Sequence, residues 1–118
     1  MNKDEMKSRT KPYALRVIRL VESLPKNRTA EVLGRQLLRS GTSVGANYRS
    51  ACRAKSRADF ISKMGTVEEE ADESMYWMEL LQETGLVSQE KLSNLQTETN
   101  QILAITISSI KTTKRNTK

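Results

Sequence analysis

The sequence predicts an all-α protein, an up-down-up-down antiparallel four-helix bundle, from its aromatic content, its turn residues and its apolar period. Aromatic residues make up only 4% of the 118 residues, whereas β-strands favour aromatic and β-branched side chains. Five Gly and two Pro supply few turns, and an all-β fold needs a turn every ~8–12 residues. Apolar residues recur instead at steps of three and four, the period of a helix. Residues 1–118 are therefore expected to form a single bundle domain.

The first expected helix follows a polar segment. Residues 1–11 carry no apolar period and are predicted to be a flexible lead-in, with Thr10 and Pro12 suited to a helix start. An apolar stripe then runs through residues 13–24, and Pro25 ends it. The link that follows is short, which predicts that the second helix runs antiparallel to the first.

The second expected helix carries glycines within its apolar seam. Thr29 is a candidate N-cap, and a seam of helical period runs from Ala30 to Ala51 through Gly41 and Gly45. One interpretation is a loop that splits the helix here, because each Gly costs about 1 kcal/mol relative to Ala in a helix interior. The favoured interpretation is a continuous helix in which the two glycines, four residues apart, share one face. A neighbouring backbone could then approach closely.

The boundaries of the third and fourth helices follow from capping residues. Ser56 and Asp59 resemble a capping box at the start of the third helix. Gly85 is expected to end that helix as a left-handed C-cap, and Ser88 to start the next. The fourth helix is expected to end at a polar, basic tail over residues 112–118.

The composition argues against most classes of enzyme. The chain has no His, which removes the commonest general base and the commonest neutral metal ligand. Neither a P-loop nor a dinucleotide-binding glycine motif is present. We therefore expect no catalytic residue, no cofactor and no enzymatic activity.

The same composition predicts a cytoplasmic protein. Cys52 is the single cysteine and cannot form an intrachain disulfide. The opening residues do not resemble a signal peptide. No apolar stretch approaches the ~20 residues needed to cross a bilayer, so no membrane association is expected.

Acidic residues cluster on the third expected helix. Glu69, Glu70 and Glu73 place carboxylates within one or two turns, and a site for a hard cation is one interpretation. Di-metal bundles, however, use Glu-x-x-His pairs, which this chain cannot form. The pattern favours a solvated face or ion pairs with a neighbouring helix, and no metal site is predicted.

Charge is segregated along the chain, and this pattern carries the functional prediction. The net charge is +6 and the pI is near 9.7, which favours an anionic partner. Seven basic residues and one acid lie from Arg35 to Lys63, whereas seven acids and no base lie from Glu68 to Glu83. The partner of the basic segment is either the phosphates of a nucleic acid or the acidic helix of the same or an adjacent subunit. The residues predicted to contact nucleic acid are Arg35, Arg39, Arg49, Arg53, Lys55 and Arg57.

Residues beside the apolar stripe of the third helix are candidates for a subunit interface. Glu70 and Glu73 are expected to pair with arginines of the second helix, inside or between subunits. Trp77, next to Tyr76, lies off the main seam, where a large aromatic residue is either part of the core or an interface anchor. The predicted interface residues are therefore Glu70, Glu73, Tyr76 and Trp77.

Two segments resemble known signatures. Residues 37–49 (LLRSGTSVGANYR) and 70–81 (EADESMYWMELL) are similar to the two motifs of a bacterial four-helix-bundle family. Its members were first noticed as open reading frames inside intervening sequences of large-subunit ribosomal RNA genes. The resemblance covers residues 13–111 and implies a homopentameric ring with a second helix continuous through the glycines. A related branch, the accessory variability protein of diversity-generating retroelements, binds nucleic acid and a reverse transcriptase.

Two functional hypotheses follow. The first is a non-enzymatic homo-oligomer, pentameric by resemblance, that binds RNA or DNA through its basic second helix. The alternative is a protein-interaction scaffold without a nucleic-acid site, for example an accessory subunit to a reverse transcriptase or another protein partner.

Overall fold

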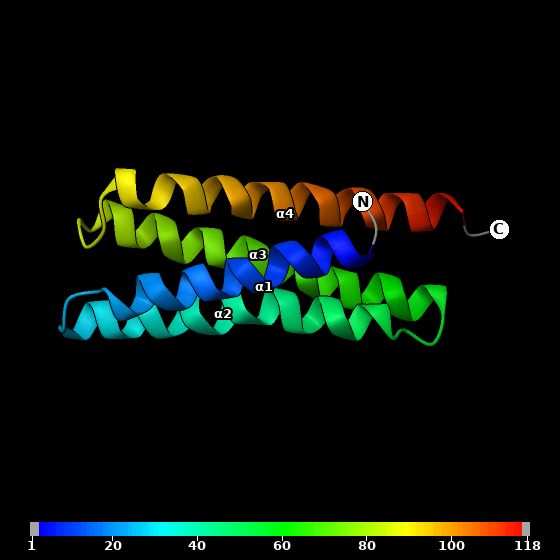
Figure 1. Cartoon of the computed structure of the whole chain (residues 1–118), viewed down its shortest axis with the longest axis horizontal. Coiled ribbons are helices and arrows are strands. Elements are labelled where there is room, and N and C mark those ends of the chain that lie inside the picture. Colours follow the sequence, from blue (N-terminus) through cyan, green and yellow to red (C-terminus); the bar gives the residue numbers. More distant parts are fainter. Residues whose placement is uncertain (1–2, 117–118) are drawn as a thin grey trace.

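The computed structural model describes residues 3–116, which form four antiparallel helices (Figure 1). These are α1 Lys3–Glu22, α2 Arg28–Cys52, α3 Arg57–Glu83 and α4 Gln89–Arg115. They lie side by side along one axis in a molecule that measures 51 × 21 × 20 Å. Each helix packs on the next in the sequence, and α4 also packs on α1. The predicted up-down-up-down four-helix bundle is confirmed.

The core is aliphatic along its whole length, as the composition predicts. Leu37, Met64, Leu81 and Leu92, which come from three of the helices, are almost completely buried. Tyr13 of α1 is the one aromatic side chain among the largest fully buried ones of the described residues. Burial of this apolar surface is the main stabilising contribution to the bundle.

A polar layer interrupts the core with one buried side chain from each helix. The Tyr13 hydroxyl lies 2.7 Å from Thr99 Oγ1, and Ser40 Oγ lies 2.8 Å from Ser74 Oγ. All four residues are at most 1% exposed. Because a shifted helix would leave such groups without partners, the layer favours a single register of the four helices.

Helix α2 runs without a break through its glycines, so the continuous interpretation is confirmed. A Cβ atom on Gly41 would lie 2.8 Å from Cγ1 of Val17, and one on Gly45 would lie 3.3 Å from Thr10. The closely approaching neighbour is therefore α1. A side chain at position 41 would displace Val17, whereas one at position 45 would require Thr10 to shift by only a few tenths of an ångström.

The predicted flexible lead-in over residues 1–11 is wrong for the part that the structure describes. Helix α1 begins at Lys3 and continues through Pro12, so Thr10 and Pro12 do not mark its start. Met6 and Thr10 are buried, and Arg9 forms a bidentate ion pair with Glu98 of α4 at 2.8 and 2.9 Å. These tertiary contacts stabilise a segment whose local sequence has little apolar period.

The cap predictions are correct for two helices and wrong for one. Helix α2 is capped by Asn27, whose side chain accepts from the backbone N of Ala30, and not by Thr29. Ser56 and Ser88 cap α3 and α4 as predicted. In α3, however, the Asp59 carboxylate accepts from the backbone N of Lys55, one residue before the cap.

The ends of α3 and α4 give one confirmation and one correction. Gly85 has φ 78°, and the backbone N–H groups of Gly85 and Leu86 donate to Gln82 and Leu81 in a Schellman motif. The predicted tail over residues 112–118 is largely helical, because α4 continues to Arg115; residues 117–118 lie outside the described part. The Thr113 hydroxyl helps by bonding the Ser109 carbonyl one turn earlier.

Candidate nucleic-acid interface

The predicted basic residues do not form one surface, because one of them is already engaged by acids of α3. Arg39 Nη2 lies 2.9 Å from a carboxylate oxygen of Glu73, and Nη1 lies 3.5 Å from Glu70. The Glu70 side chain is only 11% exposed, and a carboxylate so poorly solvated requires a positive partner, which Arg39 supplies. The expected pairing of Glu70 and Glu73 with an arginine of the second helix is thus present within one chain.

Lys55 in the α2–α3 link and Arg57, the first residue of α3, also lie apart from α2. The Arg57 guanidinium donates to the backbone carbonyl of Asn116 at the end of α4. Lys55 is exposed, and its backbone N–H donates to Asp59, whose carboxylate also receives Lys63 at 3.0 Å. The Lys55 N–H and the Lys63 ammonium hold the pKa of Asp59 below its ordinary value. Within residues 3–116, Arg57 and Lys63 are bonded to oxygen atoms in this corner, and the Lys55 ammonium has no ion-pair partner.

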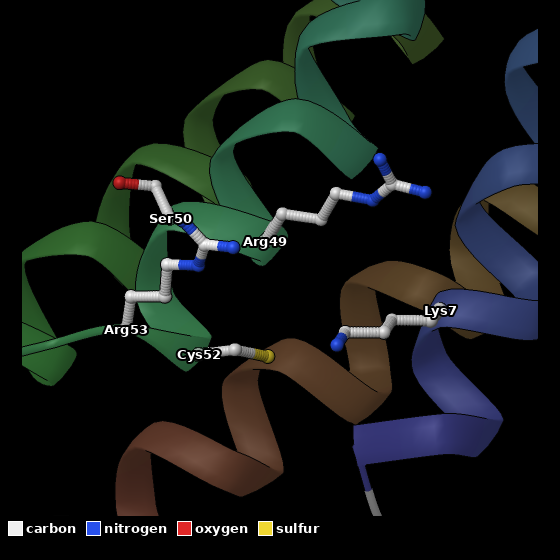
Figure 2. A pocket seen from close by; sticks show the side chains of 5 residues that line it. All are labelled: Lys7, Arg49, Ser50, Cys52 and Arg53. Carbon is white, nitrogen blue, oxygen red and sulfur yellow. The ribbon is translucent and has the colours of Figure 1, made fainter.

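Arg49 and Arg53 meet a lysine of α1 around a hollow of about 650 Å³, the cationic hollow (Figure 2). Its lining residues are Lys7, Arg49, Ser50, Cys52 and Arg53, with no acid among them. Figure 2 shows the Lys7 ammonium and the Cys52 thiol pointing toward one another, while Arg49 extends toward α1. None of these three cations has an ion-pair partner among the described residues.

The cationic surface continues along the groove between α1 and α2. A second hollow of about 240 Å³ shares Lys7 and Arg49 with the first and adds Lys11. Its floor contains Gly45 and Ala46, where small side chains let the two helices approach. Arg35 lies elsewhere, in a third hollow that also includes the acids Glu22 and Glu31.

An acidic groove lies between α3 and α4. A hollow of about 470 Å³ is lined there by Gly65, Glu68, Glu69, Asp72, Leu103 and Ile107. Its three carboxylates have no ion-pair partner within residues 3–116. In a bundle whose helices pack in sequence order, the α1–α2 and α3–α4 grooves face opposite sides of the molecule.

The two aromatic residues of the predicted interface differ in exposure. Tyr76 is 53% exposed, the largest fraction among the exposed large hydrophobic side chains of the described residues, and its ring lies edge-on to Trp77 at 5.2 Å between centroids. Trp77 is half-buried against the core, and its indole Nε1–H is the buried side-chain polar group left without a hydrogen-bond partner in residues 3–116. Tyr76 is therefore the more accessible of the two anchors.

Neither a metal centre nor a membrane span is found in the part of the chain that the structure describes. Over residues 3–116, no group of three or more His, Cys, Asp or Glu side chains is arranged to hold a metal ion. Within the same residues, no helix combines the length and apolar character needed to cross a bilayer.

Sequence reasoning missed Lys7 and Lys11. Both residues fall in the segment predicted to be a flexible lead-in, so they were not placed beside the arginines of α2. Their spacing of four residues, which puts them on one helix face, was the available signal. Among the described residues, the cations that line the cationic hollow without an ion-pair partner come from both helices, Lys7 from α1 and Arg49 and Arg53 from the C-terminal end of α2.

Comparison with known proteins identifies relatives of the chain. A family model described as 23S rRNA-intervening sequence protein matches residues 3–108. A crystal structure of a protein of unknown function from the S23 ribosomal protein family of Bacteroides thetaiotaomicron is 38% identical, with a TM-score of 0.88. The match covers 94% of this chain and 99% of that one. No curated protein matches the chain.

Proposed function

Since the chain belongs to the 23S rRNA-intervening sequence protein family, we propose that it is a non-enzymatic homo-oligomer that binds nucleic acid through basic residues of α2. The homopentameric ring that the sequence resemblance implies is part of the proposal, as is a cytoplasmic location. The absence of His throughout the chain supports the non-enzymatic part, because it removes the most common acid–base and nucleophile-activating residue.

The observation that carries the proposal is the set of unpaired cations around the cationic hollow. Arg49, Arg53 and Lys7 have no acidic partner among the described residues, although the chain contains fourteen acids. Arg49 and Arg53, four residues apart on α2, repel one another weakly and gain from a shared anion. Nucleic-acid phosphates are anions that two arginines and a lysine can contact without reading sequence.

Self-association is the second part of the proposal, and Tyr76 supports it. A tyrosine that is 53% exposed beside a half-buried tryptophan is typical of the aromatic anchors of protein interfaces. Glu70 and Glu73, which precede Tyr76 on α3, pair with Arg39 of their own chain. Of the four predicted interface residues, Tyr76 and Trp77 are therefore the ones proposed to contact another copy.

The experiment combines light-scattering mass on a size-exclusion column with fluorescence anisotropy of a short structured RNA and a matched DNA. We expect a mass larger than that of one chain. We also expect the logarithm of the association constant to fall linearly with the logarithm of the salt concentration. The double variant Arg49→Ala/Arg53→Ala should weaken binding and reduce the salt slope by about 1, because the two arginines share one phosphate. Arg35→Ala is the matched control on the same helix, and it should leave both quantities nearly unchanged.

Failure would be equally clear. A wild-type protein that binds neither nucleic acid at low salt contradicts the nucleic-acid part of the proposal. A single-chain mass for the wild type contradicts the self-association part, and a Tyr76→Ala mass equal to that of the wild-type assembly contradicts the role of Tyr76.

A second candidate function is a scaffold whose copies contact one another through complementary charge. Lys7 and Lys11 on α1, and Glu68 and Asp72 on α3, have the same four-residue spacing. Tyr13, which lies with Ser74 in the polar layer, is six residues from Lys7, just as Ser74 is six residues from Glu68. Six residues rise about 9 Å along a helix, so the two charged pairs lie at similar heights on opposite faces.

Complementary grooves on opposite faces favour a head-to-tail contact, which closes into a ring or extends into a filament. In this candidate the cations of α1 and α2 are used by the next copy and leave no site for phosphate. The two candidates are distinguished by Lys11→Glu, since Lys11 lines the α1–α2 groove and not the cationic hollow. If the protein is a scaffold, the Lys11→Glu assembly should dissociate into smaller species. If it binds nucleic acid through these cations, the mass of the assembly should stay unchanged and the affinity for nucleic acid should fall.

A further inference from the structure

The cationic hollow differs from an electrostatic track along a helix. A track would present basic side chains at regular intervals on a convex surface, where several phosphates bind weakly and in any register. Here, side chains from α1 and α2 surround a concave space of about 650 Å³, and no carboxylate lines it. Pockets that bind small molecules commonly have volumes of about 300–1,000 Å³, so a phosphate group and the sugar attached to it can enter.

The chemistry of the lining suits one phosphate group. Arg49 and Arg53 offer planar guanidinium groups, which match two phosphate oxygens at once, and Lys7 offers an ammonium from the opposite helix. Ser50 adds a hydroxyl group that can donate to a further oxygen. The three cationic side chains are free to rotate toward a ligand, because none is held by an ion pair within residues 3–116.

We infer that the hollow between the N-terminal part of α1 and the C-terminal end of α2 is a discrete binding site for a single phosphate group, with Lys7, Arg49 and Arg53 as its ligands. The inference deepens the proposed function and rests on it for one source of the phosphate, a nucleic acid. The other source is a free phosphate or a nucleotide, which carries the same group.

The position of Cys52 provides a site-specific test. It is the single cysteine of the chain, it is half-buried, and its thiol lies in the hollow opposite Lys7 (Figure 2). A bound phosphate covers the thiol and blocks the approach of the reagent, so it slows the alkylation of Cys52. The rate is measured with iodoacetamide, a neutral reagent that the cations do not attract.

The probes are inorganic phosphate, adenosine monophosphate, and one oligonucleotide with either a 5′-phosphate or a 5′-hydroxyl group. Ionic strength is held constant with sodium chloride, which also serves as the anion control. We expect phosphate to slow alkylation of Cys52 in a saturable way, whereas chloride has no effect. Each of Lys7→Ala, Arg49→Ala and Arg53→Ala should raise the phosphate concentration needed for half protection about tenfold. Arg35→Ala should leave it unchanged, and circular dichroism checks that every variant keeps its helices.

The outcomes separate this inference from the proposed function. If the oligonucleotide binds by anisotropy but no probe protects Cys52, nucleic-acid binding stands and the phosphate site is overturned. If inorganic phosphate or the mononucleotide protects Cys52 but no oligonucleotide binds, the phosphate site stands and the proposed function falls. Equal protection by chloride and phosphate, or unchanged protection in all three alanine variants, also overturns the inference.

Discussion

Glycines at two positions of this bundle have opposite structural roles, although both lie inside helices. Gly41 of α2 is where Val17 of α1 makes its closest approach, whereas a Cβ atom on Gly65 of α3 would meet nothing within 4 Å. Replacing a helical Gly by Ala gains about 1 kcal/mol from helix propensity. Overpacking a tight site costs about 1–3 kcal/mol. The same substitution should therefore have opposite signs at these two positions.

We expect Gly41→Ala to lower the free energy of unfolding by about 1 kcal/mol, because the buried Val17 cannot move away without disturbing the core. Gly65→Ala should raise it by about 1 kcal/mol and is the matched control. Urea unfolding followed by circular dichroism measures both. A Gly41→Ala protein as stable as the wild type would show that α1 can shift outward at little cost.

The Tyr13 hydroxyl makes stability depend on pH in the alkaline range. Burial raises the pKa of Tyr13 above its ordinary value, because the phenolate is poorly solvated in the core. The unfolded chain loses this proton near pH 10, before the folded chain does, so stability is complete below pH 10 and falls as pH rises beyond it. Burial also raises the pKa of Tyr48, which adds to the same trend.

The Tyr13→Phe variant isolates this contribution. Thr99 keeps a hydrogen bond to the Leu95 carbonyl in the variant, so no buried hydroxyl is left without a partner. From pH 8 to pH 11 the wild type should lose about 1 kcal/mol more stability than Tyr13→Phe. The reason is that pH 11 lies about one unit above the pKa of a tyrosine in the unfolded chain, and each such unit costs about 1.4 kcal/mol. Parallel pH profiles of the two proteins would contradict this assignment.

Among the helices, the elements with a strong apolar period were predictable and the segments held by tertiary contacts were not. The seam of α2 passes through Gly41 and Gly45 without losing its period, which is why a continuous helix could be expected. The first two turns of α1 have Met6 as their one buried apolar side chain, so no period is visible there. Their helix depends on contacts to α2 and α4, such as the Arg9–Glu98 pair, that are far apart in sequence.

The same limit applied to the candidate site. Arg49 and Arg53 could be identified from their charge and spacing, but Lys7 joins them only through the packing of α1 on α2. Arg39 has the same character in the sequence as Arg35 and Arg49. Its pairing depends on the rotation of α3, which brings Glu70 and Glu73 to its side. The segregation of charge therefore predicted that acids of the third helix pair with arginines of the second, but not which arginine forms the ion pair.

The link between α2 and α3 through Arg39 gives a prediction for these two elements. Arg39→Ala leaves the nearly buried Glu70 carboxylate without its positive partner and should cost about 1–2 kcal/mol. This is less than for a fully buried pair, because Arg39 itself is 53% exposed. Arg35→Ala, the control, should change stability by less than about 0.5 kcal/mol. Urea midpoints that shift equally in both variants would show that water alone can stabilise Glu70.

At the scale of the whole molecule, the question is whether opposite faces of the bundle recognise one another. The scaffold candidate pairs Lys7 and Lys11 of one copy with Glu68 and Asp72 of the next. Because the contact is heterologous, every copy contributes one basic and one acidic groove to two different junctions. Reversing the charge of one groove therefore changes every junction, and reversing both grooves restores every junction.

Three proteins test this arrangement by light-scattering mass. Lys7→Glu/Lys11→Glu and Glu68→Lys/Asp72→Lys should each dissociate, since like charges then meet at all junctions. The variant with all four substitutions should recover the wild-type mass, because its grooves are complementary again with the signs exchanged. A mixture of the two dissociated variants can satisfy its junctions only by alternating. It should therefore form closed assemblies with even numbers of copies and cannot close a homopentameric ring without one repulsive junction. If the fourfold variant stays dissociated while its helices remain intact, the copies do not meet through these grooves.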